Sequence, residues 1–102
     1  MYYIYMLRCK DNSIYTGITT DIERRMTEHF NQTNKCAKYT LKHEVQKLER
    51  YWETENRVLA SKLEYHIKKL NKVKKENLVN DPNCLETLLG KKINCEAYNI
   101  IK

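Results

Sequence analysis

Glycine and proline are scarce in this chain, whose 102 residues include two glycines and one proline. That scarcity excludes collagen-like repeats, flexible linkers and low-complexity disorder. Long apolar runs are also missing, since no stretch approaches the roughly 20 consecutive apolar residues of a membrane span. The N-terminus has neither the basic lead nor the apolar length of a signal peptide. We therefore expect one domain with no membrane partner, located in the cytoplasm.

Cysteines are few, and their spacing does not suit a metal site or a disulfide framework. The four are Cys9, Cys36, Cys84 and Cys95, and no two of them form a Cys-x-x-Cys pair. No cysteine lies at the short spacing from a histidine that a zinc knuckle requires. Because thiols stay reduced in the cytosol, we expect free thiols that pack as small hydrophobic side chains.

Three segments have the composition of β-strands. Residues 2–9 carry bulky side chains at odd and even positions, which is typical of a strand covered on both faces. The turn residues 10–13 join it to a second strand at 14–19. A third strand is expected at 45–52, and the tail at 93–101 is a candidate edge strand.

The first helix is predicted directly after the second strand. Thr20 and Glu23 form a capping box, in which each side chain bonds the other residue's backbone N–H. Ile22, Met26 and Phe30 then recur at helical spacing and predict one buried stripe.

Three further helices are predicted in the second half of the chain. They are expected at 56–70, at 71–78 and after the Asp81-Pro82 pair. Gly90 suits the left-handed residue just beyond the last of them. The order of elements predicts an α+β fold, with a small, mostly antiparallel sheet against which helices pack.

Positive charge is concentrated in one segment. The formal net charge is +6, and within residues 62–75 six lysines accompany a single acid, Glu64. One interpretation is a solvated helix face, with Glu64 paired to Lys68. The other is a phosphodiester-cleaving site, because Mg²⁺ binds one or two carboxylates and takes its other ligands from water and phosphate oxygens. The charge pattern leaves both interpretations open.

Five short segments follow one another in a specific order. They are Tyr3-Ile4-Tyr5, Tyr15-Thr16-Gly17, Thr20–His29, Ala37-Lys38-Tyr39-Thr40 and Glu64–Leu70. Any one of them is weakly specific. Their order and spacing together resemble the GIY-YIG nuclease superfamily, in particular its small stand-alone bacterial branch, over about residues 1–79.

The resemblance implies a fold, a reaction and a set of site residues. The fold is a three-stranded, mostly antiparallel sheet flanked by helices, and we expect residues 80–102 to pack on the same domain as a C-terminal helix and tail. The reaction is hydrolysis of DNA phosphodiester bonds with one divalent metal ion, Mg²⁺ or Mn²⁺. The implied catalytic residues are Tyr5, Tyr15, Arg25, His29 and Glu64, of which Glu64 holds the metal. Tyr3 and Thr16 replace a glycine and an isoleucine of the family pattern, and neither position supplies the chemistry.

The implied residue types suit this hydrolysis. A tyrosine acts as a general base only if its pKa falls from about 10, and we expect Arg25 and the metal to lower it. We favour Tyr5 as the base and Tyr15 as an orienting or phosphate-bonding hydroxyl, with His29 as an alternative proton relay. The planar guanidinium of Arg25 suits the charge of the transition state. Phosphates are expected on Lys38, Lys68, Lys69, Lys72 and Lys75.

Three functions remain open at this point. The leading one is a metal-dependent DNA endonuclease with little sequence specificity, selective for a structure such as a flap, nick or single strand in DNA repair or recombination. The alternative is a catalytically silent nucleic-acid-binding module, whose binding would weaken steeply with salt. The third is a protein-interaction module, in which residues 80–102 contact a second copy or another protein.

Overall fold

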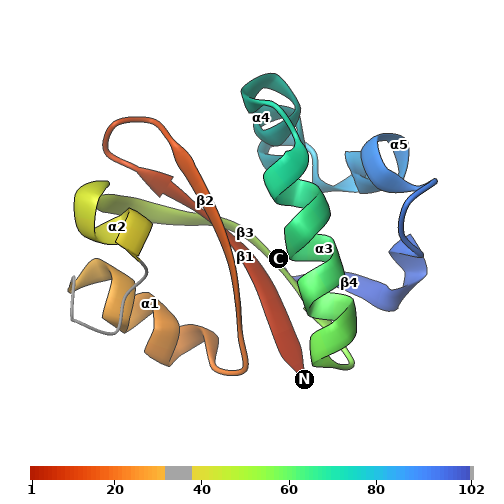
Figure 1. Cartoon of the computed structure of the whole chain (residues 1–102), viewed down its shortest axis with the longest axis horizontal. Coiled ribbons are helices and arrows are strands. Elements are labelled where there is room, and N and C mark those ends of the chain that lie inside the picture. The colour runs from red at the N-terminus through yellow and green to blue at the C-terminus, as the bar shows by residue number, and fades with distance from the viewer. Residues whose placement is uncertain (32–37, 102) are drawn as a thin grey trace.

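The computed structural model describes residues 1–31 and 38–101 (Figure 1). Cys36 and Ala37, which the sequence analysis singled out, lie outside the described residues. Cys9, Cys84 and Cys95 are free thiols, and Cys9 is fully buried. In the described part of the chain, no helix has both the length and the apolar character needed to cross a membrane.

An antiparallel sheet forms the centre of the molecule. It has four strands in the order β2-β1-β3-β4, which are Ile14–Thr19, Tyr2–Cys9, Val45–Thr54 and Tyr98–Ile101. The α+β class is confirmed, and the expected three-stranded sheet is corrected to four. The reason is that β3 continues past Trp52, so that Glu53 and Thr54 pair with the tail strand β4. The candidate edge strand in the tail therefore exists and covers one side of β3.

The turn between β1 and β2 depends on one left-handed residue. Asn12 has φ 70°, a conformation that asparagine tolerates better than most residues. The carboxylate of Asp11 accepts hydrogen bonds from the backbone N–H of Ser13 at 3.1 Å and from its hydroxyl at 2.5 Å. These bonds confirm the turn chemistry expected for residues 10–13.

Helix α1, Ile22–Phe30, begins one residue later than the capping box predicts. The N-cap is Asp21, whose extended backbone lets its carboxylate accept a bond from Arg24 N–H at 3.1 Å. Strand β2 runs through Thr19, which leaves Thr20 outside the helix. The buried stripe also differs, because Phe30 is 45% exposed whereas His29 is fully buried.

Of the remaining helices, α2 was not predicted from the sequence, and the other three follow the predicted order. They are α2 Lys38–Lys42, α3 Arg57–Lys69, α4 Lys72–Asn80 and α5 Leu85–Leu89, with single 3-10 turns at Pro82–Cys84 and Cys95–Ala97. Asn56 and Asn71 cap α3 and α4 with their side chains. The expectation for Gly90 is wrong, since its φ of −60° is right-handed.

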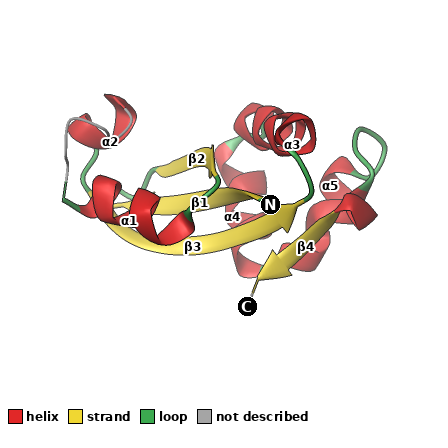
Figure 2. Cartoon of the chain, turned by 90° about the horizontal axis from the view of Figure 1, so that it is seen from below, coloured by secondary structure: helices red, strands yellow, loops and turns green. Residues whose placement is uncertain are grey.

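The helices divide between the two faces of the sheet. In both views α1 and α2 lie on one side of the strands and α3, α4 and α5 on the other (Figures 1 and 2). The larger core joins Ile4 and Met6 of β1 to Leu63 of α3 and Leu89 of α5. The alternate residues of β1, with Tyr5 among them, pack on the α1 face. Strand β1 therefore carries buried side chains on both faces, as its composition predicted.

A buried arginine ties α4 to the sheet. Arg8 on β1 is 9% exposed and donates from Nε to Glu49 at 2.9 Å. Its two terminal nitrogens donate to the two carboxylate oxygens of Glu76 on α4, each at 2.5 Å. These bonds from Arg8 hold the pKa of the Glu76 carboxyl at about 2, below its ordinary value.

Glu76→Gln removes the ion pair with Arg8 and should therefore lower the free energy of unfolding at pH 7. We expect a loss of about 1 kcal/mol, since solvent screens the partly exposed Glu76 end of the pair. A carboxyl with a lowered pKa in the folded chain stabilises it above the unfolded pKa of about 4.3. That contribution is lost as the pH falls towards the folded pKa of about 2. Urea unfolding at pH 7 and pH 3 measures the difference.

The matched control is Glu55→Gln, which removes the same charge from an exposed side chain. Its unfolding free energy should follow that of the wild type at both pH values. Equal stability of Glu76→Gln and Glu55→Gln at pH 7 contradicts the assigned role of the Arg8 pair.

Candidate active site

The hydroxyl of Tyr5 is the centre of a polar cluster on the α1 face of the sheet. Tyr5 is 1% exposed, and its oxygen lies 2.8 Å from Nε2 of His29. Arg25 donates to the same oxygen from Nε at 3.3 Å. Because a phenol has one O–H and two lone pairs, it can accept from Arg25 while donating to a neutral His29.

The spacing of α1 places these partners. Arg25 and His29 are four residues apart, so both project from one face of the helix towards β1. The Arg25 guanidinium is also paired with Glu28 at 3.0 Å, one turn along the helix. The helical pair identified in the sequence is therefore brought onto Tyr5.

Gly17 makes room for the tyrosine ring. It is the partner of Tyr5 across the β1–β2 ladder. A Cβ atom at Gly17 would lie 2.4 Å from the Tyr5 hydroxyl oxygen and 2.6 Å from Cζ. No side chain larger than hydrogen fits there unless Tyr5 moves.

Tyr15 lies beside this cluster and is held by a stack of rings. Its ring centroid is 6.2 Å from that of Tyr5 and 5.6 Å from that of His29. On its other side Tyr39 of α2 stacks on it with centroids 5.6 Å apart. Tyr39 in turn stacks on His43 at 4.1 Å, and His43 bonds Asp11 in the β1–β2 turn. The stack fixes Tyr15 at the mouth of the site.

Glu64 approaches from the other side of the sheet edge. It belongs to α3, which packs against the edge strand β2. Its side chain is 23% exposed and lies 3.5 Å from the ammonium of Lys68. The same ammonium lies 5.5 Å from the centroid of the Tyr15 ring, so Lys68 links Glu64 to Tyr15. The structure thus groups Tyr5, Tyr15, Arg25 and His29 directly, and Glu64 approaches Tyr15 through Lys68.

Burial dominates the electrostatics of the cluster. It raises the pKa of Tyr5 more than the hydrogen bond from Arg25 lowers it, and it raises the pKa of Tyr15 as well. Arg25 does act to lower the pKa of both tyrosines, as expected, but without bound metal or DNA the effect of burial is larger. Burial also lowers the pKa of His29 to about 4, with a further contribution from the Arg25 charge. His29 is accordingly neutral at pH 7.

The donor set suits a hard cation that takes most of its ligands from elsewhere. Among the described residues, no three His, Cys, Asp or Glu side chains cluster closely enough to hold a metal by themselves. Glu64 offers one carboxylate at an open edge. Mg²⁺ commonly binds one or two carboxylates and keeps water and phosphate oxygens as its other ligands. The residues present therefore fit that ion.

The lysines separate onto different surfaces. Lys68 and Lys75 line a groove of about 240 Å³ together with Tyr15 and Tyr39.

The other three predicted lysines lie elsewhere. Lys38 is exposed on α2. Lys72 bonds the backbone of Asn12 and pairs with Glu76 at 2.9 Å. Lys69 lies on the other flank of α3, over the ring of Tyr65. The predicted phosphate-binding lysines thus do not form one surface.

The structure adds residues that sequence reasoning did not assign. Arg24 and Arg57 line a depression of about 340 Å³ that also includes Arg25. Gly17 and Tyr39 belong to motifs recognised in the sequence, yet their roles depend on ring contacts across strands and helices. The signal for Gly17 was its rarity, as one of two glycines in the chain.

Several known proteins are similar to this chain in sequence. A family profile described as the GIY-YIG catalytic domain matches residues 1–77. The UPF0213 protein FN1575 of Fusobacterium nucleatum is 49% identical over 82 residues, covering 80% of each chain. The UPF0213 protein YhbQ of Salmonella arizonae is 42% identical over 89 residues, covering 87% of each.

A solved structure is similar as well. The solution NMR structure of the UPF0213 protein BH0048 from Bacillus halodurans has a TM-score of 0.51 and 41% identity. The match covers 78% of this chain and 84% of that one. From its motifs, its fold and these relatives, the chain belongs to the GIY-YIG family, a nuclease family.

Proposed function

We propose that this protein is a divalent-metal-dependent endonuclease that hydrolyses DNA phosphodiester bonds with little sequence specificity of its own. The observation that carries the proposal is the Tyr5 hydroxyl, held between Arg25 and a neutral His29 and flanked by Tyr15, which Lys68 links to Glu64. Residues 1–79 form the nuclease part in this proposal. A more specific version of the proposal is that the enzyme selects a DNA structure, such as a flap, nick or single strand, in repair or recombination.

Tyr5 and His29 form a proton relay in this mechanism. Burial raises the pKa of Tyr5, so a free phenolate is unfavourable. Instead, Tyr5 accepts a proton from the attacking water while its own proton passes to Nε2 of His29, 2.8 Å away. This requires the His29 tautomer with its proton on Nδ1. The relay unites the two alternatives that the sequence left open.

Arg25 and Tyr15 act on the phosphate. The guanidinium of Arg25 stabilises negative charge on the non-bridging oxygens, and its bond to Tyr5 orients the relay towards the same phosphorus. Tyr15 is only partly buried, and the stack on Tyr39 directs it towards the groove, where it orients the phosphate.

Glu64 would hold the metal ion, Mg²⁺ or Mn²⁺, which would supply Lewis-acid stabilisation of the leaving oxygen. The ion pair with Lys68 keeps the carboxylate beside the groove. Lys68 and Lys75 bind backbone phosphates at one end, while Arg24 and Arg57 bind them at the other.

The second candidate function is nucleic-acid binding without cleavage. The basic grooves favour it, since the one lined by Lys68 and Lys75 and the one lined by Arg24 and Arg57 would bind phosphates without any cleavage. Metal-dependent cleavage separates the two functions.

The test is nicking of supercoiled plasmid with Mg²⁺, Mn²⁺ or EDTA. We expect cleavage in either metal and none in EDTA. Glu64→Gln and Arg25→Lys should each lower the rate by about 100-fold or more, because one removes the metal ligand and the other the guanidinium fork. DNA binding in EDTA should change little.

Glu55→Gln is the matched control for Glu64→Gln and should cleave like the wild type. If no metal supports nicking of plasmid, flap or single-stranded DNA while binding persists, the silent binding module is correct instead.

Gly17→Ala tests the geometry of the relay. The new methyl group would overlap the Tyr5 hydroxyl, so the ring must shift. We expect cleavage to fall by about 100-fold, since small displacements of reacting groups are costly. The free energy of unfolding should fall by about 1–3 kcal/mol from overpacking. Single-turnover cleavage and urea unfolding measure the two effects.

The double variant Tyr5→Phe/Gly17→Ala provides the internal control. Removing the hydroxyl relieves part of the overlap, so part of the lost stability should return while cleavage stays low. Wild-type cleavage by Gly17→Ala would show that the position of the Tyr5 hydroxyl does not matter.

A further inference from the structure

A hollow of about 580 Å³ lies on the flank of α3 opposite the candidate active site. It is enclosed by α3, the start of α4 and the segment from Leu88 to Lys92. We call it the C-terminal pocket. Residues 88–92 lie beyond the part of the chain that matches the catalytic-domain profile. The pocket is therefore built by this chain's own tail together with α3.

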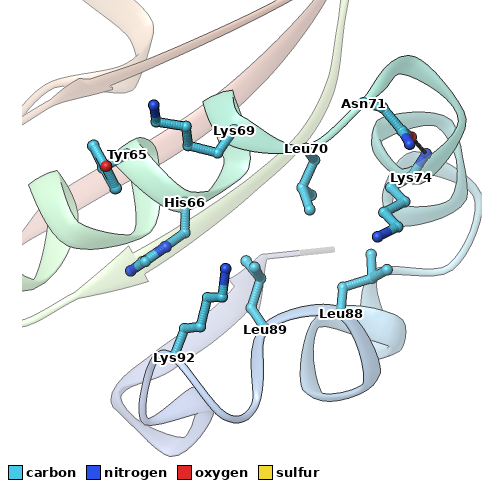
Figure 3. Close-up of a pocket in the computed structure, with 9 residues that line it drawn as sticks. All are labelled: Tyr65, His66, Lys69, Leu70, Asn71, Lys74, Leu88, Leu89 and Lys92. Carbon is cyan, nitrogen blue, oxygen red and sulfur yellow. Dashed lines mark hydrogen bonds between the residues drawn. The ribbon is translucent and has the colours of Figure 1, made fainter.

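The C-terminal pocket is lined by basic side chains and by apolar leucine side chains. Its basic side chains are His66, Lys69, Lys74 and Lys92. None of the described residues that line it carries a carboxylate. Figure 3 shows Lys74 and Lys92 reaching into the space from opposite sides, with the amino end of Lys74 next to Leu88 and that of Lys92 next to Leu89. Such a pocket attracts an anion that also has an apolar part.

An exposed aromatic ring lies at its rim. Tyr65 is 57% exposed, although it is a large hydrophobic side chain. The ammonium of Lys69 lies 5.4 Å from its ring centroid. A phenol ring beside lysines is the arrangement on which single-stranded nucleic acids stack a base and neutralise its phosphate.

The pocket and the active-site groove are lined by the same two helices, α3 and α4. The turn from α3 to α4 sends Lys68 and Lys75 to the groove and Lys69 and Lys74 to the pocket. Both surfaces lie along α3, and an α-helix with its side chains is about 10 Å wide. A single strand, with about 3.4 Å between stacked nucleotides, spans that distance in about three steps.

We propose that the C-terminal pocket binds a single-stranded segment of nucleic acid that leaves the active-site groove, with a base on Tyr65 and phosphates on Lys74 and Lys92. The inference rests on the proposed function in so far as the substrate is a nucleic acid. It deepens that function by giving residues 88–92 a part in holding single-stranded substrate.

The test is binding of a fluorescent 15-nucleotide oligothymidylate by the full chain in EDTA, followed by anisotropy across a salt series. Lys92→Ala should weaken binding by about fivefold and reduce the slope of log K against log salt by about 0.7, the value for one phosphate contact on a single strand. Tyr65→Ala should weaken it by about tenfold through lost stacking.

Lys91→Ala is the matched control, because it removes the same charge from the adjacent, exposed residue that does not line the pocket. It should bind like the wild type, and circular dichroism checks that all variants are folded. Equal binding by the Lys92→Ala and Lys91→Ala variants overturns the proposal. The proposal is also overturned if the Lys92→Ala variant loses binding of thymidylate mononucleotide or of an acidic peptide but still binds the oligonucleotide.

Because binding is measured without metal, it is independent of cleavage. A protein that binds the oligonucleotide through Lys92 but never cleaves DNA refutes the nuclease and keeps the pocket. A protein that nicks plasmid but binds the oligonucleotide equally well in both lysine variants keeps the nuclease and refutes the pocket.

Discussion

The arrangement of this molecule depends on the buried phenol of Tyr5, whose hydroxyl finds its hydrogen-bond partners on helix α1. Tyr5 comes from the strand that is covered on both faces, and His29 and Arg25 come from α1. A buried hydroxyl without partners would destabilise the fold, so α1 is held with these two side chains facing the sheet. The same requirement explains why His29, and not Phe30, is buried on α1. The glycine opposite Tyr5 in β2 leaves room for the phenol ring.

Burial also decides the chemistry of this pair. It keeps both partners neutral by raising the pKa of Tyr5 and lowering that of His29 to about 4. A neutral phenol bonded to a neutral imidazole is suited to passing a proton along, whereas a tyrosinate would have to be stabilised by added charge. The relay in our proposal follows from that balance.

Much of this fold could be predicted from the sequence, because strand and helix periodicities are local properties. The spacing of Arg25 and His29 predicted a shared helix face, and the motif order predicted that Glu64 joins them. The ring contacts of Tyr39 and the space above Gly17 could not be predicted, since they arise from packing between elements. The helix start was misplaced because Thr20 and Asp21 are both good caps, and only the end of β2 decides between them.

The lysine cluster shows the same limit. In the sequence it is one segment, but a helix turns each residue by about 100°, so neighbouring lysines face different surfaces. Lys68 faces the active-site groove and Lys69 the C-terminal pocket. The fourth strand and α5 anchor the tail that completes this pocket, and they do so through the same core that supports α3.

The most direct test of the account is single-turnover cleavage of DNA by Tyr5→Phe compared with Tyr3→Phe. Both variants remove one hydroxyl from alternate residues of β1, and Tyr3 packs edge-on against Tyr51, 6.1 Å away. We predict that Tyr5→Phe loses cleavage by about 100-fold or more with unchanged DNA binding, while Tyr3→Phe cleaves like the wild type. Cleavage at the wild-type rate by Tyr5→Phe would contradict the account.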